Sequence, residues 1–283
     1  MTDQFGALGR GTVLVLHAHP DDETFATGAA TASLAQQGCR VVLRVASGGE
    51  ASERGATVRE ARHRRARRLS RACQTLGIAE WDWIDEGRWL DTGGARATNS
   101  LTNAVVDDVA DAIAQHVRRI APDAVLTVGS DGLTRHPDHI LMHQAVNLAV
   151  GGTVPVFGSS LRADDVARGH QRLAALLPGV RVGSGRMTGS NRTDLLTVRA
   201  SPSAGSARRA ALNHYAPGLG TRPLENLLRT YPGRGDSLLL RGVLDTIGWS
   251  TERYELPAER VDVDPLSGVT AELARPSCPN TST

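Results

Sequence analysis

The feature that most constrains the fold is a regular alternation of short apolar runs with longer segments of helical periodicity. Buried strands are expected at Thr12–Leu16, Arg40–Ala46 and Ala124–Gly129, where β-branched and apolar residues follow one another. Between them, Thr57–Leu76 and Asn103–Ile120 place apolar residues at helical spacing. This order of elements predicts an α/β fold built on a mainly parallel sheet.

The expected architecture is Rossmann-like, with helices on both faces of the sheet and a variable C-terminal part. Of the 283 residues, 40% are hydrophobic, which is enough for a single domain over residues 1–270 with its core at 12–150. Residues 151–206 are richer in Gly, Ser and Arg and are expected to be an insertion or a variable loop region. The tail 275–283 (RPSCPNTST) is expected to be disordered.

The charge pattern excludes several kinds of chemistry. All 32 basic residues are arginine, so no lysine can form a Schiff base or serve a phosphate-binding loop. Strong GC bias in the coding DNA explains the use of arginine in place of lysine without a functional cause. The arginine-rich helix Arg59–Arg71 suggests a nucleic-acid-binding module as a remote alternative. The net charge of the chain is only +2, which disfavours this alternative. We therefore expect no nucleic-acid partner.

Cellular location is judged from cysteines and apolar runs. Three scattered cysteines (Cys39, Cys73 and Cys278) are too few for a disulfide framework. No apolar run approaches the ~18 residues of a transmembrane helix, and Val13–Leu16 is too short for a secretory signal. We therefore expect a reduced, cytoplasmic protein without a transmembrane segment.

Two short segments combine histidines with carboxylates at predicted strand ends. Residues 17–23 (HAHPDDE) follow the first strand, and residues 136–139 (HPDH) follow the strand at Ala124–Gly129. Because the carboxyl ends of parallel strands meet at one edge of a sheet, both segments should lie close together. One such segment could be an ordinary turn, but two in one sheet favour a functional site.

The donor types in these segments favour a catalytic metal ion. Nitrogen and oxygen donors without cysteine suit zinc or iron(II). Hydrolysis at such an ion also needs a carboxylate near the attacking water. Asp21 and Asp22 are adjacent and cannot easily point the same way, so one can bind the metal while the other accepts a proton. A zinc protease is disfavoured because the chain has no HExxH, and a dinucleotide site is disfavoured because no glycine-rich turn follows the first strand.

These residues carry a family resemblance. Ala18–Glu23, followed about a hundred residues later by His136–His139, resembles the LmbE-like family of N-acetylglucosaminyl-phosphatidylinositol de-N-acetylases. That family includes the deacetylase and the amidase of mycothiol metabolism, and deacetylases of glycopeptide and aminoglycoside antibiotic pathways. The resemblance covers residues 12–150 well and the remainder weakly.

The resemblance implies a zinc-dependent hydrolase, with iron(II) as the alternative metal, that removes acetyl from an N-acetylated amino sugar. The implied metal ligands are His19, Asp22 and His139. Asp21 would be the general base that activates water. His136 would protonate or stabilise the tetrahedral intermediate, and Asp138 would orient and tune His136.

Looser matches suggest where the substrate binds. Glu50 follows the second predicted strand, as a glutamate does in the family. Asp91 lies in a segment (GRWLDTG) that resembles one in mycothiol-type deacetylases. Arg65 is at the position where the family has a substrate-contacting arginine. Arg65 also lies in a run of arginines, so a solvent-exposed position is the competing interpretation. Thr134 replaces the tyrosine that assists the oxyanion in mycothiol-type deacetylases.

The substrate expected from these matches is a small-molecule N-acetylglucosaminyl glycoconjugate. The missing tyrosine and the long region 151–206 favour a natural-product intermediate, such as a glycopeptide or aminoglycoside antibiotic precursor. The alternative is a mycothiol-type deacetylase or a thiol-conjugate amidase. The sequence does not indicate the oligomeric state.

Overall fold

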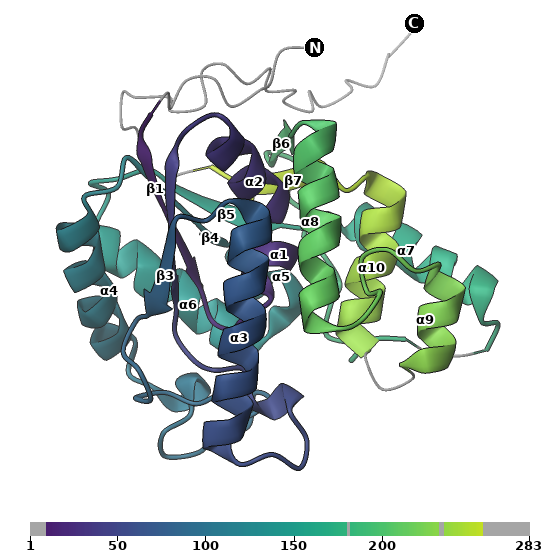
Figure 1. Cartoon of the computed structure of the whole chain (residues 1–283), viewed down its shortest axis with the longest axis horizontal. Coiled ribbons are helices and arrows are strands. Elements are labelled where there is room, and N and C mark those ends of the chain that lie inside the picture. The colour runs from purple at the N-terminus through teal and green to yellow at the C-terminus, as the bar shows by residue number, and fades with distance from the viewer. Residues whose placement is uncertain (1–9, 180–181, 232–234, 257–283) are drawn as a thin grey trace, which may run out of the picture.

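A seven-stranded sheet flanked by helices forms the centre of the molecule (Figure 1). The computed structural model describes residues 10–179, 182–231 and 235–256; the expected tail 275–283 and Cys278 lie outside the described residues. The strands are β1 (Thr12–His17), β2 (Arg40–Val45), β3 (Glu80–Trp83), β4 (Ala124–Val128), β5 (Val156–Ser160), β6 (Leu196–Arg199) and β7 (Thr251–Glu255). The predicted α/β, mainly parallel architecture is confirmed.

The strand order places a crossover point at the middle of the sheet. The order is β3-β2-β1-β4-β5-β7-β6, and β3, β2, β1, β4 and β5 pair in parallel. β7 runs antiparallel to both β5 and β6. The chain leaves β1 toward β2 and β3 and then returns to the other side of β1 as β4. Open α/β sheets bind ligands at the carboxyl ends of strands at such a point.

The helices cover both faces of the sheet. They are α1 (Asp22–Phe25), α2 (Gly28–Gln36), α3 (Val58–Leu76), α4 (Val106–Ile120), α5 (Gly132–Arg135), α6 (Pro137–Val150), α7 (Ala163–Leu176), α8 (Pro202–Tyr215), α9 (Leu224–Thr230) and α10 (Gly235–Ile247), with 3-10 turns η1 (Glu50–Ser52) and η2 (Leu101–Asn103). The two amphipathic helices predicted from periodicity are α3 and α4. A capping box of Thr57 and Glu60 begins α3, and Gly77, at φ 78°, ends it.

Alternating residues of β1 divide the core between the two faces of the sheet. Val13 and Val15 pack in one cluster with α2, α3 and α8, whereas Leu14 and Leu16 pack in another with α4 and α6. This division follows from the period of two in a β-strand. Both faces of β1 are therefore buried, and its carboxyl end is held in a fixed position.

The prediction that residues 151–206 are a loop-rich region is wrong. They contain β5, α7 and β6, which extend the sheet. Their many glycines serve turns and close approaches; Gly158, for example, lies so close to Gly129 that a Cβ would be 2.8 Å from its Cα. A further core cluster joins α7, α9 and α10 to Phe25 and Leu133, beside the predicted site (Figure 1).

Two other expectations concern cysteines and membranes. Cys39 and Cys73 are both buried. Among the described residues, the helices are all too short or too polar to cross a membrane.

Candidate active site

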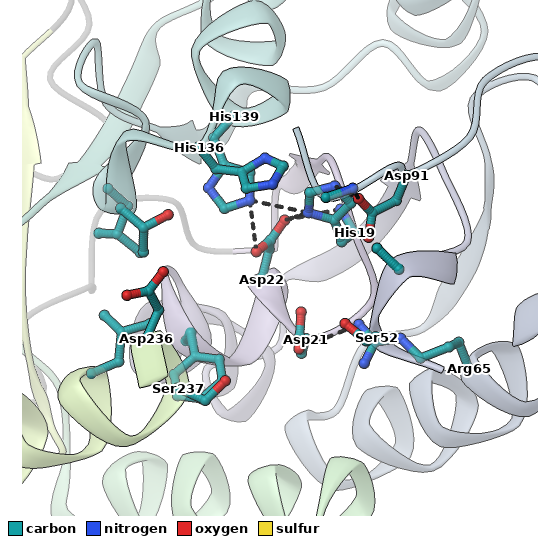
Figure 2. A pocket seen from close by; sticks show the side chains of 16 residues that line it. His19, Asp21, Asp22, Ser52, Arg65, Asp91, His136, His139, Asp236 and Ser237 are labelled. Atoms are coloured by element: carbon teal, nitrogen blue, oxygen red, sulfur yellow. Dashed lines mark hydrogen bonds and ion pairs between the residues drawn. The ribbon is translucent and has the colours of Figure 1, made fainter. Parts of the chain in front are cut away.

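A cavity of about 210 Å³ opens at the carboxyl ends of β1 and β4 (Figure 2). The predicted site residues that line it are His19, Asp21, Asp22, Arg65, Asp91, His136 and His139. The first three follow β1 and the two histidines of the second segment follow β4, so the parallel sheet brings the two segments together as expected. Glu50 and Asp138 lie behind the wall of the cavity.

The turn after β1 separates the two adjacent aspartates. Asp21 has φ 111°, a backbone conformation that a residue with a side chain rarely adopts. Asp22 begins α1 directly after it. Asp22 consequently points toward the histidines, whereas Asp21 points toward Arg65 (Figure 2).

Three donor atoms converge between the two segments. His19 Nδ1 lies 3.1 Å from His139 Nε2, and Asp22 Oδ1 lies 3.2 Å from the same nitrogen. The other oxygen of Asp22 lies 3.5 Å from His19 Nδ1. His136 also contributes a nitrogen to a group of three ring nitrogens, with those of His19 and His139, that lie within 4.8 Å of one another.

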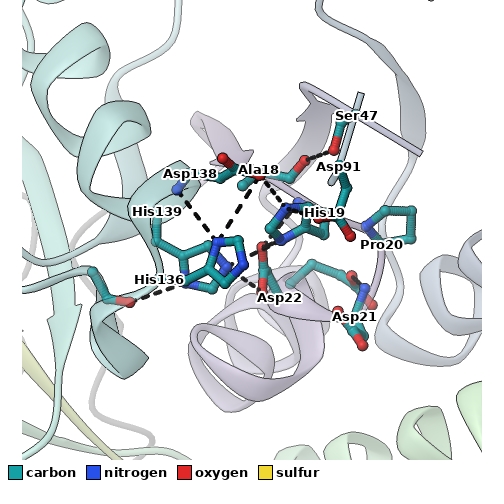
Figure 3. A network of polar contacts seen from close by, with 12 residues as sticks. Ala18, His19, Pro20, Asp21, Asp22, Ser47, Asp91, His136, Asp138 and His139 are labelled. Carbon is teal, nitrogen blue, oxygen red and sulfur yellow. Dashed lines mark hydrogen bonds and ion pairs between the residues drawn. The ribbon is translucent and has the colours of Figure 1, made fainter. Parts of the chain in front are cut away.

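Hydrogen bonds on the far side of each ring define the tautomers (Figure 3). His139 Nδ1 donates to the Gly132 carbonyl at 2.9 Å, and His19 Nε2 donates to Asp138 Oδ2 at 3.0 Å. Each ring therefore turns a lone pair toward the other ring and toward Asp22. Three lone pairs facing one point, with buried acceptors behind the rings, fit a divalent metal ion.

The charges around this point favour a cation. Burial lowers the pKa of His19, but the carboxylates of Asp91, Asp138 and Asp22 outweigh burial and raise this pKa well above its usual value. Burial raises the pKa of Asp22, but His139 and His19 lower it well below the usual range. The carboxylates therefore stabilise positive charge at the centre of the cluster.

Asp138 contacts a different histidine from the one expected. It is completely buried; Oδ2 accepts from His19 Nε2 at 3.0 Å, and Oδ1 accepts from the hydroxyl of Thr102. Its carboxylate oxygen Oδ2 lies 4.0 Å from His136 Nδ1, beyond hydrogen-bonding distance. The structure thus places Asp138 where it orients the implied metal ligand His19 rather than His136.

His136 is held by backbone and lines the cavity as a neutral ring. Its Nδ1 accepts from the backbone N–H of Asp138 at 3.3 Å, which leaves the proton on Nε2. Burial, followed by the neighbouring His19 and His139, lowers the pKa of His136 to about 4. At neutral pH this ring can donate a hydrogen bond but carries no charge.

Arg65 lies inside the molecule, not among the solvated arginines of α3. It is 3% exposed, its Nη2 lies 3.3 Å from Asp21 Oδ2, and it also donates to the Pro20 carbonyl. Burial raises the pKa of Asp21, and Arg65 partly opposes that rise. Other arginines of α3 pair with acids: Arg62 with Glu50, and Arg64 and Arg68 with Glu53.

Glu50 and Asp91 act together, but only Asp91 reaches the cavity. Asp91 Oδ1 lies 3.8 Å from His19 Nε2 and accepts from the Gly93 N–H at 2.8 Å. Glu50 accepts from the Asp91 N–H at 3.0 Å and pairs with Arg62 at 2.9 Å. The contacts of Glu50 therefore position the Asp91 loop, and Glu50 lines no part of the cavity.

One wall of the cavity was not expected from the sequence. Asp236, Ser237 and Leu240 of α10 face the histidine cluster across the cavity (Figure 2). The leucine-rich pattern of 235–247 could have indicated a helix, but no local signal indicates that it packs against the site. Thr134 also lines the cavity, near Leu133, whose φ of 59° is strained.

The fold and the convergent His/Asp cluster define an α/β protein with a candidate metal-binding site at a sheet crossover. Residues 14–150 match the profile of the GlcNAc-PI de-N-acetylase (PIG-L) family. The chain therefore carries a PIG-L (LmbE-like) family domain, as its motifs predict.

Curated relatives give a more specific comparison. The chain is 33% identical over 177 residues to a 1D-myo-inositol 2-acetamido-2-deoxy-alpha-D-glucopyranoside deacetylase of Kineococcus radiotolerans, covering 50% of this chain and 48% of that protein. The chain spans about half the length of the curated relatives it matches.

Solved structures resemble the chain in fold. The A40926 pseudoaglycone deacetylase Dbv21 is 21% identical, with a TM-score of 0.57 over 88% of this chain and 97% of that one. GalB, the 4-carboxy-2-hydroxymuconate hydratase of Pseudomonas putida, is 17% identical, with a TM-score of 0.53 over 89% of this chain and 98% of that one. One fold thus accommodates different reactions, so the function has to be argued from the site.

Proposed function

We propose that the chain is a metal-dependent N-deacetylase that hydrolyses the acetamide of an N-acetylglucosaminyl conjugate. The observation that carries this proposal is the set of three lone pairs from His19, Asp22 and His139, beside the separate carboxylate of Asp21. The PIG-L family domain and the deacetylase names of the curated relatives support the same reaction.

His19, Asp22 and His139 would hold zinc or iron(II). When bound, such an ion polarises the amide carbonyl and lowers the pKa of water. Asp138 and the Gly132 carbonyl keep the two rings in the binding tautomer. The donor atoms of these three residues, counting both carboxylate oxygens of Asp22, lie 3.1–3.5 Å from one another across the cluster, close enough for one ion to be held between the residues.

Proton transfer would be carried out by Asp21. Its carboxylate accepts a proton from the attacking water and returns it to the leaving amine nitrogen, which balances the proton across hydrolysis. Neutral His136 would donate a hydrogen bond from Nε2 to the oxygen that becomes negative. His136 therefore serves better as a stabiliser of the intermediate than as an acid.

The relatives favour a different substrate from the one that the sequence led us to expect. The curated names point to an N-acetylglucosaminyl inositol, whereas the antibiotic deacetylase resembles this chain only in fold. We therefore propose an N-acetylglucosaminyl group on a small polyol as substrate, with an antibiotic intermediate as the second candidate. Asp91 and Arg65 would contact the sugar, and Asp236 and Ser237 would contact the group attached to it.

A substrate panel tests this proposal. Zinc-loaded protein is incubated with N-acetylglucosaminyl myo-inositol, free N-acetylglucosamine and an N-acetylglucosaminyl glycopeptide, and released acetate and amine are measured. We expect the inositol conjugate to give the highest kcat/KM, and chelation to abolish turnover. Higher kcat/KM for the glycopeptide would reverse the order of substrates; no acetate from any of them would refute the reaction.

A further inference from the structure

A closed ring of buried contacts holds both the backbone and the side chain of Asp21. The Asp21 N–H donates to Glu23 Oε2 at 2.9 Å, and the hydroxyl of Tyr215 donates to Glu23 Oε1 at 2.7 Å. The Arg65 guanidinium lies 5.5 Å from the centre of the Tyr215 ring. Arg65 then closes the ring through its ion pair with the Asp21 carboxylate (Figure 2).

The members of this ring behind Asp21 are almost completely buried. Glu23 is 0% exposed, and Tyr215 and Arg65 are each 3% exposed. Neither Glu23 nor Tyr215 lines the cavity, so neither can contact a substrate there. Both carboxylate oxygens of Glu23 are hydrogen-bonded, and such a buried group holds its partners in one geometry. An effect of Glu23 or Tyr215 on the reaction must therefore pass through the residues that they contact, Asp21 and Arg65.

Asp21 needs such support because its backbone is strained. A non-glycine residue at φ 111° persists only where its surroundings hold it. This conformation also directs the Asp21 carboxylate toward Arg65 and away from the histidines that Asp22 contacts. The bond from the Asp21 N–H to Glu23 restrains the peptide on one side, while Arg65 restrains the carboxylate on the other.

Tyr215 lies at the end of α8, outside the residues that match the family profile. α8 packs along α3 and α2 and reaches α1 (Figure 1). We propose that Tyr215, acting through Glu23, is a positioning residue for Asp21, an inference that rests on the proposed function. Through Tyr215, α8 thereby contributes to catalysis without contacting the substrate.

Removal of one hydroxyl tests this role, and the chain provides a matched control. Tyr254 is also buried, and its hydroxyl donates to Glu252 Oε2 at the same distance, 2.7 Å. Tyr215→Phe should lower kcat about 10- to 100-fold, with KM and bound zinc unchanged, because a small displacement of a base is costly. Tyr254→Phe should keep the wild-type kcat. Equal kcat in the two variants would overturn the proposal.

A second variant and a second measurement keep the test independent of folding and of activity. Glu23→Gln keeps the side-chain shape but can set an NH2 group against the Asp21 N–H. The double variant Glu23→Gln/Tyr215→Phe should have a kcat no lower than that of the weaker of the two single variants, because both residues act on Asp21 through one path. If the two losses in kcat multiplied instead, Glu23 and Tyr215 would have independent, merely structural roles. Hydrogen exchange at the Asp21 amide should accelerate in Tyr215→Phe and in Glu23→Gln but not in Tyr254→Phe; unchanged exchange would overturn the proposal.

These measurements separate the two proposals. If the wild type releases no acetate from any substrate, the proposed function fails. The exchange rate of the Asp21 amide still decides whether Tyr215 holds that residue.

Discussion

Asp138 shows how one buried residue determines what its neighbours can do. The family resemblance led us to assign this aspartate to His136, three residues before His139 on the same segment. In the structure its carboxylate binds His19, a partner 119 residues away, and Thr102 completes its contacts. An orienting carboxylate behind a metal-binding histidine fixes the ring and its tautomer. Asp138 is therefore expected to act on metal affinity.

Substitution of Asp138 by Asn should weaken zinc binding about 10- to 100-fold, because His19 loses a charged acceptor. Competition with a chelator measures this affinity. Asp165→Asn, at another fully buried aspartate remote from the cavity, should leave zinc affinity unchanged. Wild-type zinc affinity in Asp138→Asn would return the residue to its predicted role beside His136.

The two adjacent aspartates should separate metal binding from turnover. Asp21→Asn is expected to keep zinc and to lower kcat at least about 100-fold, because the base is lost while the ligands remain. His19→Ala should lose both zinc and activity. Zinc content and acetate release are measured on the same preparations, and full activity in His19→Ala would disprove the assigned site.

At the scale of elements, the loop between β4 and α6 positions His139. Gly132 adopts φ 66°, and its carbonyl accepts from His139 Nδ1. A Cβ on Gly132 would lie 2.9 Å from Ile140 Cγ1 and 3.0 Å from His139 Cβ. Gly151, at the other end of α6, has φ 56° and nothing within 4 Å of such a Cβ. Backbone strain is thus comparable at both glycines, but steric crowding occurs only at Gly132.

Gly132→Ala should accordingly cost about 2–3 kcal/mol of unfolding free energy and weaken zinc binding, because strain and displacement of His139 combine. Gly151→Ala should cost only about 1 kcal/mol and leave zinc affinity unchanged. Denaturant unfolding and zinc titration of both variants check this. Equal zinc affinity in the two variants would show that the loop does not position His139.

For the whole molecule, the late strand β7 ties the C-terminal part to the sheet. Asp165 of α7 is fully buried, and Arg253 of β7 contacts it through Nε at 2.6 Å and Nη2 at 3.2 Å. Burial raises the pKa of Asp165, but its bonds to Arg253 and Arg168 outweigh burial, so this pKa lies below its usual value of 3.8. The carboxylate therefore stabilises the fold when ionised.

The sign of the pH dependence follows from that lowered pKa. Above the unfolded-state pKa the stabilisation by Asp165 is fully present, and it is lost as the pH falls through the lower folded-state pKa. Asp165→Asn should lower the unfolding free energy at pH 7 by about 2 kcal/mol and reduce its decline between neutral and acidic pH. Asp194→Asn, at an exposed pair with Arg192, should change little. If the unfolding free energies of wild type and Asp165→Asn changed with pH in parallel, this role of Asp165 would be contradicted.

The sequence alone determined the sheet core and the principal site. The strands that precede HAHPDDE and HPDH were recognisable from local apolar patterns, and the carboxyl ends of parallel strands bring such segments together. His19, Asp21, Asp22, His136 and His139 could therefore be named in advance. Local periodicity also predicted α3 and α4, because each buries one continuous face.

Only the tertiary structure decided which side chains meet. The partner of Asp138, the burial of Arg65, the position of Glu50 behind Asp91 and the wall formed by α10 depend on contacts between residues far apart in the chain. The strands in 151–206 were missed because their glycines resemble loop composition until neighbouring strands are present. The hydrogen bond between Tyr215 and Glu23 could likewise not be predicted from the sequence, since it spans 192 residues. Local sequence encodes periodicity and turn chemistry, whereas such long-range pairings arise only when the whole core packs.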